Sequence, residues 1–315
     1  MKAVLHYRAS PGFQRRVAEA ADAMGLRAVT VDETDEEGFG REIADAEVLL
    51  HVLQPATAAR IAAAPRLRLI QKIGVGVNTI DLDAAKARGI QVANMPGANS
   101  QAVAELTLAL MLAALRRLPY LDPLTRSGGG WAPDLAAIDQ IGELAGRTVG
   151  FVGFGAVPSR LAPALAALGA QVIYAARGPR DCAVATPCSL QEVMETADIV
   201  SLHVPLTEET RLLVDARALA RMKPGAVLIN TARGELVDQV ALVEALRTGR
   251  LRAAGLDVFD REPVDPSDPL LALPNVVLTP HVGWLTQETL ERSLALAFEN
   301  CRRLQRDEPL LHRVA

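Results

Sequence analysis

Aromatic side chains are scarce in this sequence. Phe, Trp and Tyr make up 3% of its 315 residues, while Ala, Leu and Val are abundant. Buried parallel strands are typically aliphatic, whereas many antiparallel sheets draw heavily on aromatic residues. The composition therefore favours helices packed on parallel strands over an aromatic-rich antiparallel sandwich. At this length the chain exceeds one ordinary hydrophobic core and has room for two domains.

Cysteine and dense positive charge are also in short supply. Cys182, Cys188 and Cys301 have neither the spacing of a disulfide framework nor that of a zinc site, so we expect no metal centre. The formal net charge is −4 and no block of Lys and Arg occurs. This balance argues against nucleic acid as a partner.

Long apolar runs are missing as well. The longest, residues 106–115, ends at Arg116 and is too short to span a bilayer. The first twelve residues lack the apolar segment of a signal peptide. We therefore expect no membrane partner and a cytoplasmic location, where reduced cysteines are normal.

Short apolar runs alternate with helical patterns along the chain. Residues 2–7 and 67–73 read as strands, and the alternation restarts near residue 146 after a cluster of turn residues at 94–97. Such alternation is typical of an α/β fold with parallel sheets. The second half of the chain is therefore predicted to be a doubly wound domain, to which the final helical segment need not belong.

A glycine-rich turn stands between a predicted strand and a predicted helix, in the stretch GFVGFGAVP at residues 150–158. Gly153 would permit a tight turn, and Gly155 would let the backbone approach a pyrophosphate at the positive end of the helix. A purely structural turn is the alternative, which the strand–turn–helix setting disfavours. Pro158 replaces the usual third glycine, but proline is tolerated in a first helical turn.

The residues after the next strand bear on which dinucleotide is bound. An acidic residue usually stands there to hold the ribose 2′-hydroxyl of NAD, but this sequence has Ala176. Arg177 and Arg180 follow, and guanidinium groups can pair with a 2′-phosphate. We therefore favour NADP(H), with NAD(H) as the alternative if the two arginines are merely solvated.

Three sets of polar residues follow predicted strands in the last third of the chain. Arg233 could bind a carboxylate through two hydrogen bonds. Asp257 and Glu262 supply carboxylates, and His281 is fixed between proline and glycine just past a strand. Open α/β sheets bind ligands at this edge. The other four histidines are expected to be structural.

Together these segments resemble the D-isomer-specific 2-hydroxyacid dehydrogenase family, in the order that the family has them. The segments that carry the resemblance are KIGVGVNTID at 72–81, AVAE at 102–105, the turn at 153–158, NTARGELVD at 230–238, GLDVFDREP at 255–263 and TPH at 279–281. They are spread over most of the chain and are more specific together than any one motif.

The resemblance implies a particular domain organisation. A Rossmann cofactor domain, residues 99–285, would be inserted into a discontinuous flavodoxin-like substrate domain made of residues 1–98 and 286–315. The active site would lie in the cleft between these two doubly wound domains. The resemblance also implies a homodimer built around the cofactor domain.

The resemblance further implies roles for individual residues. Arg233 would bind the substrate, Glu262 would be the carboxylate partner, and His281 would be the acid or base. On the substrate side the resemblance implies that backbone amides of Val75 and Gly76 meet the substrate carboxylate. Trp284 would either line the pocket or pack where the two domains meet. The expected cofactor contacts are Gly153, Gly155, Ala156, Val157, Arg177, Arg180, Val204, Pro205, Thr231, Ala232 and, against the nicotinamide ring, Asp257.

These residue types suit hydride transfer to a keto carbon. Protonated His281 would donate to the keto oxygen, Glu262 would stabilise the imidazolium, and Arg233 would hold the substrate carboxylate. We therefore expect reduction of a small 2-oxo acid, of glyoxylate, hydroxypyruvate or pyruvate type, to the D-2-hydroxy acid. The sequence leaves the particular acid open.

Two alternatives remain at this point. One is a phosphoglycerate-type dehydrogenase, which would need basic residues for the phosphate, and Lys72 is the one candidate that the sequence offers. The other is a non-catalytic, dinucleotide-sensing protein similar to the corepressors that resemble this family. The complete set of Arg233, Glu262 and His281 argues against the second.

Overall fold

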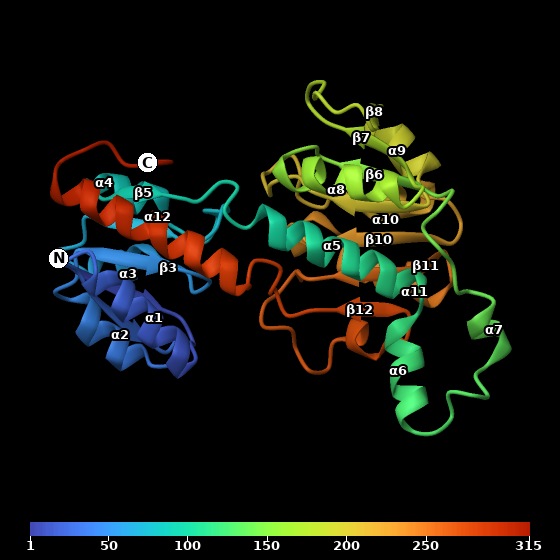
Figure 1. Ribbon diagram of the computed structural model, residues 1–315, viewed down its shortest axis with the longest axis horizontal. Coiled ribbons are helices and arrows are strands. Elements are labelled where there is room, and N and C mark those ends of the chain that lie inside the picture. The colour runs from blue at the N-terminus through green and yellow to red at the C-terminus, as the bar shows by residue number, and fades with distance from the viewer. The chain divides into compact units, whose positions relative to one another are not determined.

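Every pairing between strands within the two sheets of this protein is parallel. The computed structural model describes residues 1–315 and divides into two compact units (Figure 1). Unit 1 comprises Met1–Asn99 with Leu285–Ala315, and unit 2 comprises Ser100–Trp284. The predicted α/β class with parallel sheets is confirmed. None of the helices combines the length and the apolar character needed to cross a membrane.

Unit 1 contains a five-stranded sheet in the order β2-β1-β3-β4-β5. This is the flavodoxin-like order, as expected. Its elements are β1 (Lys2–His6), α1 (Pro11–Asp22), β2 (Arg27–Val31), α2 (Glu36–Ile43), β3 (Val48–His51), α3 (Ala58–Ala62), β4 (Leu69–Lys72), α4 (Leu82–Ala87), β5 (Gln91–Ala93) and, from the far end of the chain, α12 (Gln287–Gln305).

Unit 2 contains a seven-stranded sheet in the order β12-β11-β10-β9-β6-β7-β8. The order reverses between β6 and β9, which is the Rossmann switch point. Its elements are α5 (Ser100–Leu115), α6 (Leu118–Arg126), α7 (Leu135–Ile138), β6 (Thr148–Val152), α8 (Ala156–Ala167), β7 (Gln171–Ala175), β8 (Ala185–Pro187), α9 (Leu190–Thr196), β9 (Ile199–Leu202), α10 (Ala216–Arg221), β10 (Ala226–Asn230), η1 (Gly234–Leu236), α11 (Gln239–Arg247), β11 (Leu251–Leu256), η2 (Pro269–Ala272) and β12 (Val276–Leu278).

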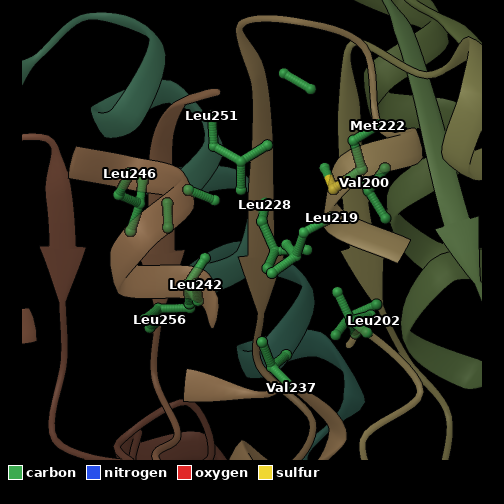
Figure 2. Packing of buried hydrophobic residues seen from close by; sticks show 14 of the residues in the cluster. Val200, Leu202, Leu219, Met222, Leu228, Val237, Leu242, Leu246, Leu251 and Leu256 are labelled. Atoms are coloured by element: carbon green, nitrogen blue, oxygen red, sulfur yellow. The ribbon is translucent and has the colours of Figure 1, made fainter. Parts of the chain in front are cut away.

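The central strand β10 shows why this sheet is covered on both faces. Leu228 points to the side of α10 and α11, where it packs among Leu219 and Leu242 (Figure 2). Its neighbours Val227 and Ile229 belong to a second cluster, with residues of α5 and α8. Successive side chains of a strand alternate between faces, so an unbroken aliphatic run needs helices on both sides.

Three helices were not predicted from the sequence. Helix α2 begins at Glu36, where Asp35 caps it by accepting a hydrogen bond from the backbone N–H of Gly38 (2.8 Å). Acidic residues in a first helical turn also suit the helix dipole. Helices α6 and α7, around the glycine-rich loop at 127–130, were not predicted.

A buried amide pair ties α12 to the sheet of unit 1. The Nδ2 atom of Asn300, which is 0% exposed, donates to Oε1 of Gln71 on β4 (2.7 Å) and to the carbonyl oxygen of Leu311 (3.0 Å). Gln71 in turn donates to the carbonyl oxygens of Lys72 and Ala93 (3.2 Å each). Every polar side-chain atom of this network therefore has a partner, although 229 residues separate its two amides.

We expect Asn300→Ala to lower the free energy of unfolding by about 1–3 kcal/mol, the usual effect of leaving buried polar groups without partners. Urea denaturation of the two proteins measures this difference. The control is Gln305→Ala, an exposed position on the same helix, which should change stability by less than about 0.5 kcal/mol. Equal effects of the two substitutions would contradict the structural role of Asn300.

Candidate active site

The residues predicted to form the site in unit 2 follow the carboxyl ends of parallel strands. Gly153 follows β6, Val204 follows β9, Arg233 follows β10, Asp257 follows β11, and His281 lies just beyond β12. Carboxyl ends of parallel strands share one edge of a sheet, so the fold gathers these residues there.

The glycine-rich turn has the features of a pyrophosphate site. Gly153 has a φ of +90°, and a Cβ there would lie 2.6 Å from the carbonyl oxygen of His203 and 2.9 Å from Val204. Gly155 precedes α8, has no side-chain cap, and leaves the space around its missing Cβ open to 4 Å. A helix N-terminus without a cap and with an open approach suits an anionic phosphate.

The Pro158 irregularity does not disturb this turn. Because α8 begins at Ala156, Pro158 and the preceding Val157 lie in the first turn, where backbone N–H groups have no partner within the helix. Pro158 is buried against the core. The residues present therefore fit a dinucleotide.

Arg177 and Arg180 lie on an exposed turn after β7. The hydroxyl of Tyr174 accepts a hydrogen bond from the backbone N–H of Arg180 (2.8 Å) and lies 3.3 Å from its carbonyl oxygen. The turn is thus held to the strand, while neither guanidinium forms an ion pair within the chain. Ala176 is exposed beside them and carries no charge.

His281 and Glu262 form a direct pair. The Nδ1 atom of His281 lies 2.6 Å from Oε2 of Glu262, and Oε1 of Glu262 accepts from the backbone N–H of Phe259 (3.0 Å). Burial alone would raise the pKa of Glu262, but the hydrogen bond and charge of His281 outweigh it and leave that pKa below its usual value. The carboxylate therefore stays ionised beside the imidazole.

Asp257 fixes the loop that carries His281. Its Oδ1 accepts from the hydroxyl of Thr279 (2.6 Å) and the N–H of Val282 (2.9 Å), and its Oδ2 accepts from the N–H of Gly283 (2.8 Å). Asp257 is 2% exposed, and burial raises the pKa of its carboxyl against the opposing effect of these hydrogen bonds. The sequence predicted a contact between Asp257 and the nicotinamide ring, but it did not predict these hydrogen bonds to the loop of His281.

Arg233 is held beside the same pair by its neighbours. Asn230 donates to the carbonyl oxygen of Arg233 (2.7 Å) and accepts from the N–H of Ala232 (3.0 Å). A Cβ on Gly234 would lie 1.8 Å from the carbonyl carbon of Phe259, so only glycine allows this approach. Burial lowers the pKa of Arg233, while the charges of Glu235 and Glu262 act in the opposite direction.

The remaining predicted cofactor contacts also lie at this edge. Val204 and Pro205 lie one residue beyond β9, and Thr231 and Ala232 follow β10. The hydroxyl of Thr231 lies 2.9 Å from that of Thr107 on α5, which fixes its direction. Asn230, Gly234, Thr279 and Thr107 were not predicted. The last three act through contacts between distant segments, whereas Asn230 acts through the turn that it forms with Ala232 and Arg233.

The predicted substrate contacts divide between the units. Val75 and Gly76 belong to unit 1, in the loop after β4, and neither backbone N–H has a hydrogen-bond partner in the chain. The carbonyl oxygen of Val75 accepts from Asn94 (2.8 Å), which orients this loop. Trp284 is the last residue of unit 2 and is 9% exposed.

Comparisons with known proteins point to one family. Residues 108–283 match the model of the D-isomer specific 2-hydroxyacid dehydrogenase NAD binding domain. Glyoxylate reductase of Aeropyrum pernix is 43% identical over 251 residues, which cover 76% of this chain and 74% of that protein. The solved TT0316 protein of Thermus thermophilus is 37% identical over 100% of both chains, with a TM-score of 0.88.

A second kind of relative is longer than this chain. D-3-phosphoglycerate dehydrogenase of Mycobacterium leprae is 40% identical over 287 residues, which cover 89% of this chain. The same match covers 53% of that protein. The chain therefore spans about half the length of this relative.

We expect Gly234→Ala to lower the free energy of unfolding by about 1–3 kcal/mol or more, because the new methyl group would overlap the Phe259 backbone. Gly40→Ala is the matched control, since a Cβ there meets nothing within 4 Å and alanine favours a helix. Denaturant unfolding of both variants tests the expectation. A Gly234→Ala protein as stable as Gly40→Ala would refute the close approach.

Proposed function

Since this chain belongs to the D-isomer-specific 2-hydroxyacid dehydrogenase family, and is thus an oxidoreductase that uses a nicotinamide dinucleotide, we propose that it reduces a small 2-oxo acid to the D-2-hydroxy acid. The proposed substrates are of glyoxylate, hydroxypyruvate or pyruvate type. The observation that carries the proposal is the 2.6 Å contact between His281 and Glu262, with Arg233 near enough for its charge to act on Glu262.

Arg233 holds and polarises the substrate in this proposal. A guanidinium can bind a carboxylate through two parallel hydrogen bonds, which fixes both position and orientation. Its partly buried setting strengthens such bonds, because less water competes for them. The N–H groups of Val75 and Gly76 have no partner in the chain and are the donors that unit 1 would offer to a substrate carboxylate.

His281 supplies the proton. The nicotinamide ring, when bound, provides the hydride, and negative charge then develops on the keto oxygen of the substrate. Protonated His281 donates to that oxygen as a general acid. The ionised Glu262 stabilises the imidazolium and holds the ring in one orientation, and Asp257 fixes the loop that carries it.

NADP(H) is the proposed cofactor, with NAD(H) as the alternative. Arg177 and Arg180 have no ion pair within the chain, and the uncharged Ala176 would not repel a 2′-phosphate. The Tyr174 hydroxyl holds the turn close to β7, so the two guanidiniums need little further ordering.

The phosphoglycerate-type alternative has less support than it had from sequence. Lys72 is 6% exposed, and its Nζ atom donates to the carbonyl oxygen of Val52 and lies 3.3 Å from Nδ1 of His51. Burial, with the charge of Lys72, lowers the pKa of His51 to about 3, so the neutral imidazole can accept from the lysine. An ammonium group engaged in this way is a poor ligand for a substrate phosphate.

We also propose a homodimer built on unit 2. Figure 1 shows α6 and α7 standing apart from the sheet of this unit. Trp131, Leu135 and Leu118 in this region are 94%, 76% and 50% exposed. Large apolar side chains gathered on one protruding segment are typical of an interface.

We expect His281→Ala to reduce kcat for 2-oxo acid reduction by at least about 100-fold, the usual loss with a general acid. Glu262→Gln should also reduce kcat, since the imidazole loses the carboxylate that holds its orientation. Spectrophotometric assays across pH measure both, and His312→Gln, an exposed position in unit 1, serves as control. An unchanged rate in His281→Ala would remove His281 from the mechanism.

We expect the double variant Arg177→Ala/Arg180→Ala to lose about tenfold or more in kcat/KM with NADPH and to change little with NADH, because charged hydrogen bonds contribute about 1.5–3 kcal/mol. Parallel assays with the two cofactors test this difference. Arg160→Ala, exposed on α8, should behave like the parent. A parent enzyme that prefers NADH would refute the proposed cofactor.

A further inference from the structure

Three arginines of unit 2 gather around one short segment, residues 140–142. A Cβ on Gly142 would lie 2.5 Å from Nη2 of Arg147 and 3.2 Å from Nη1 of Arg252. Arg117 donates to the side-chain oxygen of Gln140 (2.5 Å), and Arg252 lies 3.4 Å from the carbonyl oxygen of the same residue. The segment is itself fixed, because the N–H of Gly142 donates to the carbonyl oxygen of Leu115 at the end of α5 (3.0 Å).

No carboxylate neutralises this cluster. None of Arg117, Arg147 and Arg252 forms an ion pair within the chain. The opposing charge that affects Arg252 is that of Asp198, which already accepts from Lys223 (3.1 Å) and from the N–H of Thr148 (2.8 Å). Burial lowers the pKa of Arg252, and the charge of Arg147 lowers it further.

Several of the guanidinium N–H groups are also buried without a partner. These are Nε of Arg117 and both Nε and Nη2 of Arg252. Nε and Nη2 form the edge of a guanidinium that binds a carboxylate or phosphate through two parallel hydrogen bonds. A buried donor without a partner lowers the stability of the folded protein, so this edge of Arg252 is suited to bind an acceptor from outside the chain.

The cluster is separate from the candidate active site of the same unit. Arg147 precedes β6 and Arg252 is the second residue of β11, so both lie at the amino edge of the seven-stranded sheet. Gly153, Arg233 and His281 lie at the carboxyl edge. Neither the dinucleotide nor the 2-oxo acid therefore accounts for these arginines.

We propose that Arg117, Arg147 and Arg252 form a second anion site, which binds the phosphoryl group of a small molecule. Three positive charges match an anion with two or more negative charges, and a single carboxylate would leave most of the repulsion in place. The phosphoryl group would take the unused edge of Arg252. Arg147 and Arg117 are only partly buried and can move apart to admit it.

The experiment measures the melting temperature of the NADP⁺-saturated enzyme in sodium phosphate and in sodium chloride of equal ionic strength. Saturating NADP⁺ keeps inorganic phosphate out of the dinucleotide site. We expect phosphate to raise the melting temperature by about 3–6 °C, the scale for a bound ligand in large excess over its dissociation constant. Arg252→Met should reduce this rise to under about 1 °C, while Arg247→Met, an exposed arginine on α11, should retain it.

A second readout separates this site from a structural role. In chloride, Arg252→Met should melt no lower than the parent, because it removes a desolvated cation that its neighbours repel. Its kcat/KM should stay within about twofold of the parent, since the carboxyl edge is untouched. If Arg252→Met fails to fold, Arg147→Gln, at a half-buried position, replaces it in the same comparison.

Two results would overturn the proposal. One is that phosphate does not raise the melting temperature of the parent, or raises it equally in Arg252→Met and Arg147→Gln. The other is loss of the dimer in Arg252→Met, seen by light scattering, without any phosphate effect in the parent. That second result would assign the arginines to carboxylates of another copy of this chain.

Discussion

The buried carboxylate of Asp257 is the constraint on which the candidate active site depends. It lies at the end of β11 and accepts hydrogen bonds from Thr279, Val282 and Gly283, which flank His281. His281 itself has a positive φ of 54°, a backbone conformation that a non-glycine residue keeps only where its surroundings enforce it. The position of the imidazole is thus set by the sheet rather than by a mobile loop, and Glu262 then sets its orientation.

Glycines at this edge act by permitting contacts between segments. Gly283 leaves room for Asp257, since a Cβ would lie 2.8 Å from its Oδ2. Gly234 lets the Arg233 segment reach the Phe259 backbone, and Gly153 lets the β6 turn reach the end of β9. The same residue type therefore brings together three loops that are far apart along the chain, which is how separate strand ends become one site.

The sequence predicted the sheets better than the contacts that support the candidate site. Aliphatic runs located nearly all strands, because a strand buried on both faces leaves an unbroken local signal. Arg233, Glu262 and His281 were predicted from residue type and from the resemblance to a known family. Helix α2 was missed because Gly38 and Gly40 weaken its helical pattern. The approach of Gly234 to Phe259 and the grouping of Arg117 with Arg252 depend on pairings between distant segments that no local pattern reveals.

The Asn300–Gln71 pair has a consequence for the order in which the protein folds during synthesis. Strand β4 leaves the ribosome long before α12, and all of unit 2 is made between them. Until α12 arrives, the side-chain oxygen of Gln71 lacks its donor and the part of β4 on which α12 packs stays uncovered. Unit 2 is continuous in sequence, so it can fold as soon as its own residues have been synthesised. The nascent chain therefore carries an incomplete unit 1 while unit 2, which follows it, can already fold, and this interval is when the protein is most exposed to aggregation.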